Sequence, residues 1–207
     1  MQLAVLISGR GSNLEAIVKA SQSDPLSYPE VCLVISNNPY ARGLYLDCLG
    51  SIPTFVADSS DDFVCECQIM SAIESHFITH IALAGFMKVL SPMFCREYEG
   101  RMLNIHPSIL PKYKGLNTHK RAIESGEKIH GCSVHYVTKE LDSGPVIAQS
   151  TITIEENDTP ETLASRLLAK EHNLYPKVLS LIYSEELKYR WGDIYFRGNL
   201  LSNPLVF

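Results

Sequence analysis

The sequence predicts an α/β fold in which a doubly wound, mostly parallel sheet carries helices on both faces. Short apolar segments typical of buried strands alternate with longer segments of helical character, and this alternation favours parallel strands joined by helices. In the second half, two strand-like segments flank a short loop that contains Asp and Gly, which indicates an antiparallel excursion. No internal repeat or low-complexity linker interrupts the 207 residues, so we expect a single domain.

The elements of the first part follow from apolar runs and from the residues that end them. Residues 3–7 are a continuous apolar run, as a strand buried on both faces would be. Glycine commonly follows the last turn of a helix, so Gly50 is expected to end one. In chain order we expect a strand over 3–7, a turn over 8–13, a helix over 14–20, a strand over 31–35, a helix over 41–49 and a strand over 54–56.

Helix-capping residues place the elements that follow, because Ser, Thr and Asp side chains can accept from the first amides of a helix. The candidate caps are Asp58, Ser59 or Ser60 for a helix that runs to about His76, Ser91 for a helix opened by Pro92, and Asp158 or Thr159 for a long amphipathic helix to about Ser180. Strands are expected over 81–84, 102–106, 134–137 and 146–149, and the tail from Trp191 to Phe207 is expected to pack as a strand or a helix.

Composition argues against several classes of protein. The formal net charge is −5 and Lys and Arg form no block, so we expect no nucleic-acid partner. No apolar run reaches the roughly 18 residues that a membrane-spanning helix needs, and the first residues lack the basic start of a signal peptide. The six cysteines are scattered without a C-x-x-C pair, which favours reduced thiols in a cytoplasmic protein and no metal site.

The turn after the first strand is a candidate phosphate site. A helix N-terminus presents amides and a positive dipole end, and glycines at 9 and 11 let the backbone approach an anion closely. The side chains of Ser12 and Asn13 can add hydrogen bonds. Leu14 stands where a dinucleotide-binding motif has its third glycine, and the Lys of a nucleoside-triphosphate loop is missing. Taken alone, G-x-G is equally typical of a plain strand-to-helix turn.

Asn104 and His106 are candidate catalytic residues at the end of a strand. Residues two apart in a strand project from the same face, and ligands of doubly wound sheets bind beyond the carboxyl ends of the strands. An Asn amide can stabilise the oxyanion of an acyl transfer, and a His can supply a proton. Asp142 could hold that His charged. A hydrogen-bonded core pair and an ordinary turn aspartate are the alternative interpretations.

Several segments together resemble those of the glycinamide ribonucleotide formyltransferase family. They are Leu6-Ile7-Ser8-Gly9-Arg10-Gly11-Ser12-Asn13-Leu14, Leu83-Ala84-Gly85-Phe86-Met87, Leu103-Asn104-Ile105-His106-Pro107-Ser108-Ile109-Leu110-Pro111, His130-Gly131-Cys132-Ser133-Val134-His135, Glu140-Leu141-Asp142-Ser143-Gly144-Pro145 and Glu171-His172. They occur in the family's order over nearly the whole chain, which makes the resemblance specific.

The resemblance implies transfer of a formyl group from 10-formyltetrahydrofolate to the amine of glycinamide ribonucleotide, in purine synthesis and without a metal. It implies a nucleotide- and phosphate-binding N-terminal half and a folate-binding C-terminal half with the catalytic loop, with residues 136–142 closing over the folate pocket and His119 and His135 beside the site. The implied catalytic residues are Asn104, His106 and Asp142. The implied substrate contacts are Gly11, Ser12, Asn13 and Glu171. The implied folate contacts are Met87, Lys88, Val89, Leu90, Asn104, Glu140 and Asp142.

A few positions depart from the family pattern. Lys88 and Val89 stand where the family commonly has Arg and Ile, and main-chain contacts should tolerate both changes. Asp62 falls where an Arg often lies near the folate tail, and Leu168 replaces a polar residue near the ribose. We therefore expect the departures to affect binding rather than chemistry.

Other functions compete with this interpretation. A formyltetrahydrofolate deformylase, or a related transferase with another sugar-phosphate amine as acceptor, is the nearest alternative. Methionyl-tRNA formyltransferase carries a further C-terminal domain and binds RNA, for which the length and charge leave no room. A nucleotide-binding module without catalysis would not need the Asn, His and Asp. We expect a cytoplasmic monomer or homodimer.

Overall fold

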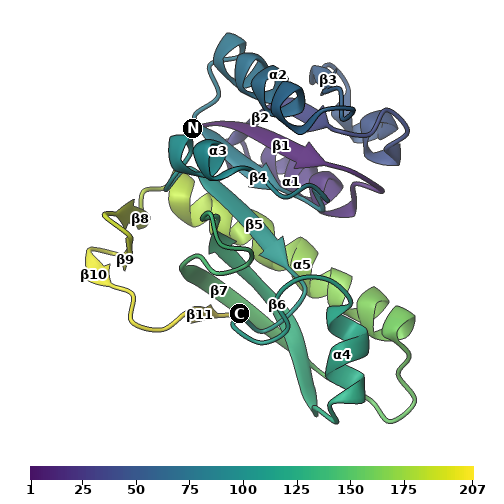
Figure 1. Cartoon of the computed structure of the whole chain (residues 1–207). Coiled ribbons are helices and arrows are strands. Elements are labelled where there is room, and N and C mark those ends of the chain that lie inside the picture. The colour runs from purple at the N-terminus through teal and green to yellow at the C-terminus, as the bar shows by residue number, and fades with distance from the viewer. The chain divides into compact units, whose positions relative to one another are not determined.

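The computed structural model describes all residues from 1 to 207, and the chain divides into two compact units, residues 1–103 and 104–207. Strand β5 (Met102–His106) begins in the first unit and ends in the second. Figure 1 colours the first unit from purple to teal and the second from teal to yellow. The expected single domain stays a prediction, and each unit is described by itself.

The first unit is built on four parallel strands. They are β1 (Gln2–Ile7), β2 (Glu30–Ser36), β3 (Thr54–Val56) and β4 (His80–Leu83), in the order β3-β2-β1-β4. Val5 of the central strand pairs with Val34 on one side and Ala82 on the other. Residues 3–7 are fully buried, which confirms the expectation from their apolar run.

Helix α1 (Ser12–Ser23) joins β1 to β2, helix α2 (Asp62–Ser75) joins β3 to β4, and helix α3 (Pro92–Glu97) follows β4 and leads to β5 (Figure 1). The chain passes outward from β1 to β3 and then returns to place β4 on the other side of β1. Because parallel crossovers are right-handed, this reversal puts α1 and α2 on opposite faces of the sheet. The reversal also makes the carboxyl ends of β1 and β4 the switch point, where ligands of such sheets bind.

Two expectations for the first unit are wrong in detail. The segment 41–49 is not one helix but two short 3₁₀ turns, η1 (Arg42–Tyr45) and η2 (Asp47–Leu49), because Leu46 between them is extended, with φ −72° and ψ 133°. The cap of α2 is Asp61, whose carboxylate accepts from the amide of Val64 at 2.8 Å. Asp58 instead accepts from the amide of Ser60 and forms a separate turn.

The second unit contains the antiparallel part of the sheet. Strands β6 (Ile129–Tyr136) and β7 (Val146–Thr153) pair antiparallel, and β11 (Leu205–Val206) pairs parallel with β7, in the order β5-β6-β7-β11. The long helix α5 (Pro160–Tyr183) packs along β6 and β7 (Figure 1). Thr159 caps α5 in a capping box with Thr162, as the sequence predicted. The predicted α/β class, with its antiparallel excursion, is confirmed.

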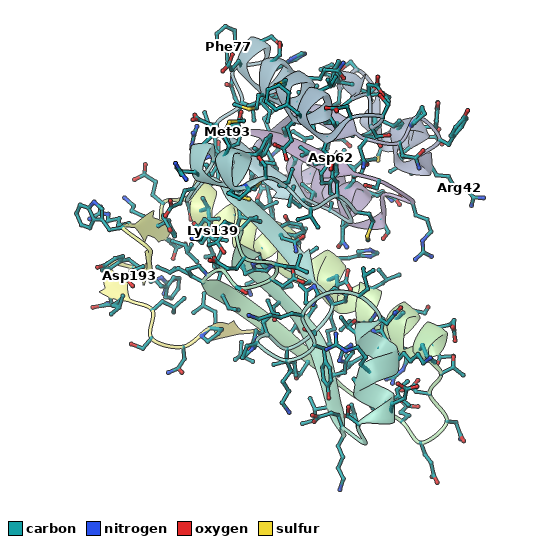
Figure 2. All side chains as sticks on the ribbon, in the orientation of Figure 1. Arg42, Asp62, Phe77, Met93, Lys139 and Asp193 are labelled. Atoms are coloured by element: carbon teal, nitrogen blue, oxygen red, sulfur yellow. The ribbon has the colours of Figure 1, made fainter.

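The remaining elements of this unit are small. Helix α4 (Thr118–Glu124) was not expected, because it is short and buries only Thr118 and Ala122. The tail forms an antiparallel three-stranded sheet of β8 (Leu187–Arg190), β9 (Asp193–Phe196) and β10 (Asn199–Leu200). Figure 2 labels Asp193 on this sheet and, in the first unit, Phe77, which is 78% exposed after the last turn of α2. None of the helices is long and apolar enough to span a bilayer.

Candidate active site

The loop between β1 and α1 leaves the start of α1 without a side-chain cap. The N-cap residue is Gly11, with φ 80° and ψ 21°, and its carbonyl accepts from the amide of Glu15 at 2.8 Å. Glycine adopts this left-handed conformation readily, and it adds no side chain that would compete with a ligand. Ser12 follows as the first helical residue and is half-buried. A helix end of this kind is suited to hold an anion, and the phosphate site at Gly11, Ser12 and Asn13 stays a prediction.

A close approach of two backbone segments fixes this loop. The amide of Gly43 donates to the carbonyl of Gly9 at 3.0 Å. A methyl group added at Gly11 would lie 2.6 Å from Cα of Gly43, and one added at Gly43 would lie 3.0 Å from Cα of Gly11. A side chain at either position would therefore require the facing backbone to shift.

Ser8 connects the ends of three strands, and the sequence did not single it out. Its hydroxyl donates to Oδ1 of Asn37 at 2.6 Å and accepts from the amide of Met87 at 2.8 Å. Its own amide donates to the carbonyl of Gly85 at 3.1 Å, and its carbonyl accepts from Nδ2 of Asn38 at 3.0 Å. Ser8 thereby ties the anion-binding loop to the segment that follows β4.

The segment Met87–Leu90 lies at the switch point and is held by one face of α2. Met87 and Val89 are each 73% exposed, whereas Leu90 is buried. Lys88 forms an ion pair with Asp62 in the first turn of α2 (labelled in Figure 2). One helical turn further on, Glu66 is buried and accepts from the amide of Ser91 at 2.6 Å and from its hydroxyl. Two carboxylates four residues apart thus fix both ends of the segment.

In the second unit, Asn104 is oriented by His135. Nδ2 of Asn104 lies 3.2 Å from Nε2 of His135, and Nδ1 of His135 lies 2.9 Å from the carbonyl oxygen of Tyr136. A carbonyl can only accept, so Nδ1 of His135 carries the proton. Burial lowers the pKa of His135, so the ring is neutral near pH 7 and its Nε2 accepts from the Asn104 amide. An amide has two N–H groups, so Asn104 retains a second donor.

His106 is buried with both ring nitrogens next to acceptors. Nδ1 lies 3.4 Å from Oδ2 of Asp142, and Nε2 lies 2.9 Å from the carbonyl oxygen of Tyr113. Neither an ionised carboxylate nor a carbonyl can donate, so both nitrogens of His106 find partners only when both carry protons. The imidazolium form therefore fits this environment best.

Asp142 is held in a conformation that few residues adopt. Its φ is 47°, in the left-handed region, and its side chain is only 8% exposed. The amide of Gly115 donates to Oδ2 at 2.8 Å, while Oδ1 lies 3.7 Å from Nε2 of His135. Asp142 therefore faces one ring nitrogen of His106 and one of His135. Strained backbone of this kind concentrates at functional sites.

His119 and His130 form a second pair in the same unit. Nε2 of His130 lies 3.0 Å from Nδ1 of His119, and the rings meet edge to face with centroids 5.0 Å apart. Burial lowers the pKa of both rings, that of His130 to about 4. The charge of His106 adds to the effect on each. Both rings are therefore neutral near pH 7.

Two further residues that the sequence analysis named lie in the second unit. Glu171 is buried on α5. The pKa of the Cys132 thiol on β6 is raised to about 12, mainly because the thiol is buried and secondly by the charge of Glu171. Glu140 is exposed and lies 3.6 Å from Nζ of Lys139 (Lys139 is labelled in Figure 2). The structure therefore brings Asn104, His106 and Asp142 together around His135, and Glu140 directs its carboxylate to Lys139.

The His, Cys, Asp and Glu side chains form no group of three arranged to hold a metal ion.

Sequence reasoning missed contacts that depend on main-chain groups. The carbonyl of Tyr113 and the amide of Gly115 have no signature in residue type. The positive φ of Tyr113, 56°, is what turns its carbonyl toward His106, and such a conformation is rare for an aromatic residue.

A side-chain amide near a histidine that is paired with a carboxylate, on a doubly wound α/β fold, provides the groups that acyl transfer needs. Residues 1–179 match the formyl transferase family, and the chain belongs to that family.

The relatives are similar along most of this chain. The phosphoribosylglycinamide formyltransferase of Escherichia coli is 40% identical over 97% of this chain and 96% of its own length. The crystallised phosphoribosylglycinamide formyltransferase of Coxiella burnetii is 43% identical, with a TM-score of 0.93 over 100% of this chain and 99% of that one. The trifunctional purine biosynthetic protein adenosine-3 of Gallus gallus is 40% identical, but this chain spans only 18% of its length. A formyltetrahydrofolate deformylase of Pseudomonas putida is more distant, at 26% identity.

Proposed function

We propose that this chain transfers the formyl group of 10-formyltetrahydrofolate to the amine of glycinamide ribonucleotide, giving formylglycinamide ribonucleotide and tetrahydrofolate in purine biosynthesis. The observation that carries the proposal is the hydrogen-bonded arrangement at the end of β5, where an oriented amide and a histidine paired with a carboxylate occur together. The similarity to the enzymes of Escherichia coli and Coxiella burnetii supports this choice of substrates.

The chemistry assigns one role to each polar group. The substrate amine attacks the formyl carbon, and the carbonyl oxygen becomes an oxyanion. The N–H of Asn104 that His135 does not use donates to this oxygen. His106 stabilises the charge as the imidazolium and gives a proton to the departing folate nitrogen, while Asp142 keeps the ring charged and oriented. The bond from the formyl carbon to the folate nitrogen breaks, and the proton that the amine loses as the new C–N bond forms passes through Asp142 or water to restore the imidazolium of His106.

The family resemblance also assigns binding groups for the two substrates. The start of α1, with Gly11, Ser12 and Asn13, would bind the phosphate of the ribonucleotide, and Glu171 would contact the same substrate. The main chain of Met87–Leu90 would bind the folate ring system, together with Asn104, Asp142 and Glu140. Lys88 is already paired with Asp62, so its contribution to folate binding would come from the backbone.

The remaining expectations belong to the same proposal. The enzyme would act in the cytoplasm as one catalytic domain, as a monomer or homodimer, on small molecules alone. The net charge of −5 gives no basic surface for nucleic acid, which is consistent with a small-molecule enzyme.

A spectrophotometric assay of the purified chain with 10-formyltetrahydrofolate, with and without glycinamide ribonucleotide, tests the reaction. We expect folate consumption only when the ribonucleotide is present, with formation of formylglycinamide ribonucleotide. Consumption without the ribonucleotide would instead identify a deformylase. Consumption that requires a different sugar-phosphate amine would replace the acceptor but keep the chemistry.

Asn104→Ala tests the catalytic assignment. Loss of an oxyanion donor should lower kcat by about 10²-fold or more, with the KM for each substrate changed little. Ser125→Ala, an exposed change on the loop after α4, provides the control and should keep wild-type rates. A kcat for Asn104→Ala within about twofold of the wild type would remove Asn104 from the chemistry.

A further inference from the structure

Residues 112–117, here called the 112–117 loop, connect the two proposed catalytic side chains through main-chain groups. The carbonyl of Tyr113 accepts from Nε2 of His106 at 2.9 Å. Two residues later, the amide of Gly115 donates to Oδ2 of Asp142 at 2.8 Å. The position of this loop therefore determines where the imidazole and the carboxylate lie relative to each other.

The loop adopts a backbone conformation that needs support from outside it. Tyr113 has φ 56° and Asn117 has φ 58°, and both are non-glycine residues in the left-handed region. Such residues persist only where surrounding contacts determine the conformation. On one side, Glu127 accepts from the hydroxyl of Tyr113 at 3.1 Å and from Nζ of Lys112 at 2.7 Å. These two contacts hold the start of the loop.

Arg121, on α4, holds the middle of the loop. Its Nη1 donates to the carbonyl of Lys114 at 2.7 Å and reaches that of Leu116 at 3.4 Å. The centre of the guanidinium lies 5.3 Å from the centroid of the Tyr113 ring. One planar cation thus contacts three of the loop's residues, which the point charge of a lysine could not do in the same way. Arg121 takes part in none of the ion pairs of the chain, so its polar contacts are with the loop backbone.

We propose that Arg121 is a positioning residue for formyl transfer, which acts by fixing the 112–117 loop and, through it, the pairing of His106 with Asp142. The inference rests on the proposed function, because it assigns Arg121 to the same catalytic pair. Arg121 itself does not contact either catalytic side chain. Its effect reaches them through the Tyr113 carbonyl and the Gly115 amide.

Arg121→Ala is compared with Lys120→Ala, which removes the same charge from the next residue of α4. Lys120 is exposed, and its ammonium lies 3.7 Å from Glu124. For Arg121→Ala we expect kcat to fall by about 10-fold, because small misplacements of catalytic groups cost rate, while the KM for both substrates stays within about twofold. The alkaline limb of the kcat profile should move to lower pH, because a displaced Asp142 stabilises the imidazolium less. Lys120→Ala should match the wild type.

A second variant separates positioning from general loss of structure. Arg121→Lys keeps a charged donor but loses the planar fork, so its kcat should lie between those of the wild type and Arg121→Ala, with a smaller shift of the same pH limb. An equal fall in kcat for Arg121→Ala and Arg121→Lys with an unshifted pH profile would overturn the proposal. Wild-type kinetics for Arg121→Ala would overturn it as well.

Nitrogen-15 NMR of the His106 imidazole tests the inference without any catalytic turnover. In the wild type, Nε2 should appear protonated, because it lies 2.9 Å from the Tyr113 carbonyl, which can only accept, and Arg121→Ala should weaken this hydrogen-bonded Nε2–H signal. An unchanged His106 signal in Arg121→Ala would refute the positioning role. If the wild type transfers no formyl group, the proposed function fails, and this spectrum still decides the role of Arg121.

Discussion

Single residues in this chain take their roles from their hydrogen-bond partners more than from their type. Seven histidines occur in the sequence, and burial lowers the pKa of His135, His119 and His130. His106 and His135 each lie between a main-chain carbonyl and the carboxylate of Asp142, but Nδ1 of His106 is 3.4 Å from that carboxylate, whereas Nε2 of His135 is 3.7 Å from it and also faces the Asn104 amide. His135, which keeps its proton on Nδ1 for a carbonyl, becomes the acceptor that orients Asn104. The histidines are thus the same by residue type but differ in their hydrogen-bond partners.

Asp142→Asn provides a prediction at this scale. Asparagine keeps the shape of the side chain but loses the charge that stabilises the imidazolium of His106. We expect a lower kcat and an alkaline limb of the pH profile that moves to lower pH, since His106 then loses its proton more readily. Measurement of kcat from pH 5.5 to 9 checks both effects.

Asp193→Asn, an exposed change on β9 (labelled in Figure 2), is the matched control and should leave the profile as it is. A profile of unchanged shape for Asp142→Asn would show that Asp142 does not act on His106.

At the residue scale, the sequence predicts contacts between residues that are close together in the chain better than contacts between residues that are far apart. Asn104 and His106 could be placed together, because the period of two along a strand puts them on one face. The anion-binding helix end could be predicted from its glycines. The contacts of His106 with Tyr113 and of Asp142 with Gly115 could not, because they depend on a left-handed residue and on main-chain atoms.

At the scale of elements, burial patterns were the reliable guide. The strands over residues 3–7, 54–56 and 102–106 were predicted almost to the residue. Only the first follows from an unbroken apolar run buried on both faces, because β3 is partly exposed and β5 carries Asn104 and His106. The helix over 41–49 was wrong, because the extended Leu46 divides this segment into two short 3₁₀ turns. Helix α4 was missed because its seven residues carry a mostly polar pattern. Its importance comes from Arg121, which no periodicity indicates.

The packing of α4 against β6 through His119 and His130 makes the stability of the protein depend on pH. The pKa of His130 is lowered from 6.5 to about 4, first by burial and then by the charges of His119 and His106. Between about pH 4 and pH 6.5, the unfolded chain therefore binds more protons than the folded chain. The free energy of unfolding consequently falls as the pH drops through this range. The contribution is fully present above pH 6.5 and amounts to about 1–3 kcal/mol.

His130→Gln should flatten this dependence. Urea denaturation at pH 7.5, 6 and 5 gives the slope for both proteins, and His80, whose pKa is also lowered to about 4 by burial, contributes equally to each. The wild type should lose more stability than His130→Gln over this range. Identical slopes would show that the buried pair is not the titrating element.

For the whole molecule, the C-terminal strand closes one edge of the sheet in the second unit. Leu205 and Val206 pair with Ala148 and Gln149 of β7. The carbonyl of Phe207 accepts from the hydroxyl of Ser150 at 2.6 Å, and its ring lies 4.0 Å from Nζ of Lys177. An unpaired edge strand is a template for association with other chains. The tail therefore serves solubility as well as stability.

Deletion of residues 203–207 should expose this edge. We expect the free energy of unfolding to fall by about 1–3 kcal/mol, from a few lost hydrogen bonds and one cation–π contact, and light scattering should detect concentration-dependent association. Phe207→Ala, which keeps the strand but removes the ring, should cost less stability and should not associate. A truncated protein that stays dispersed at high concentration would argue against the protective role of β11.

The contact between Gly11 and Gly43 has a consequence for the evolutionary history of the chain. The two backbones are in close contact at Gly11 and Gly43, so a side chain at one position requires the backbone at the other position to shift. Among relatives that retain this loop, we therefore expect both positions to remain glycine. Where one changes, the stretch around the other should carry an insertion or deletion, so that the two sites vary as a pair although 32 positions separate them in the sequence.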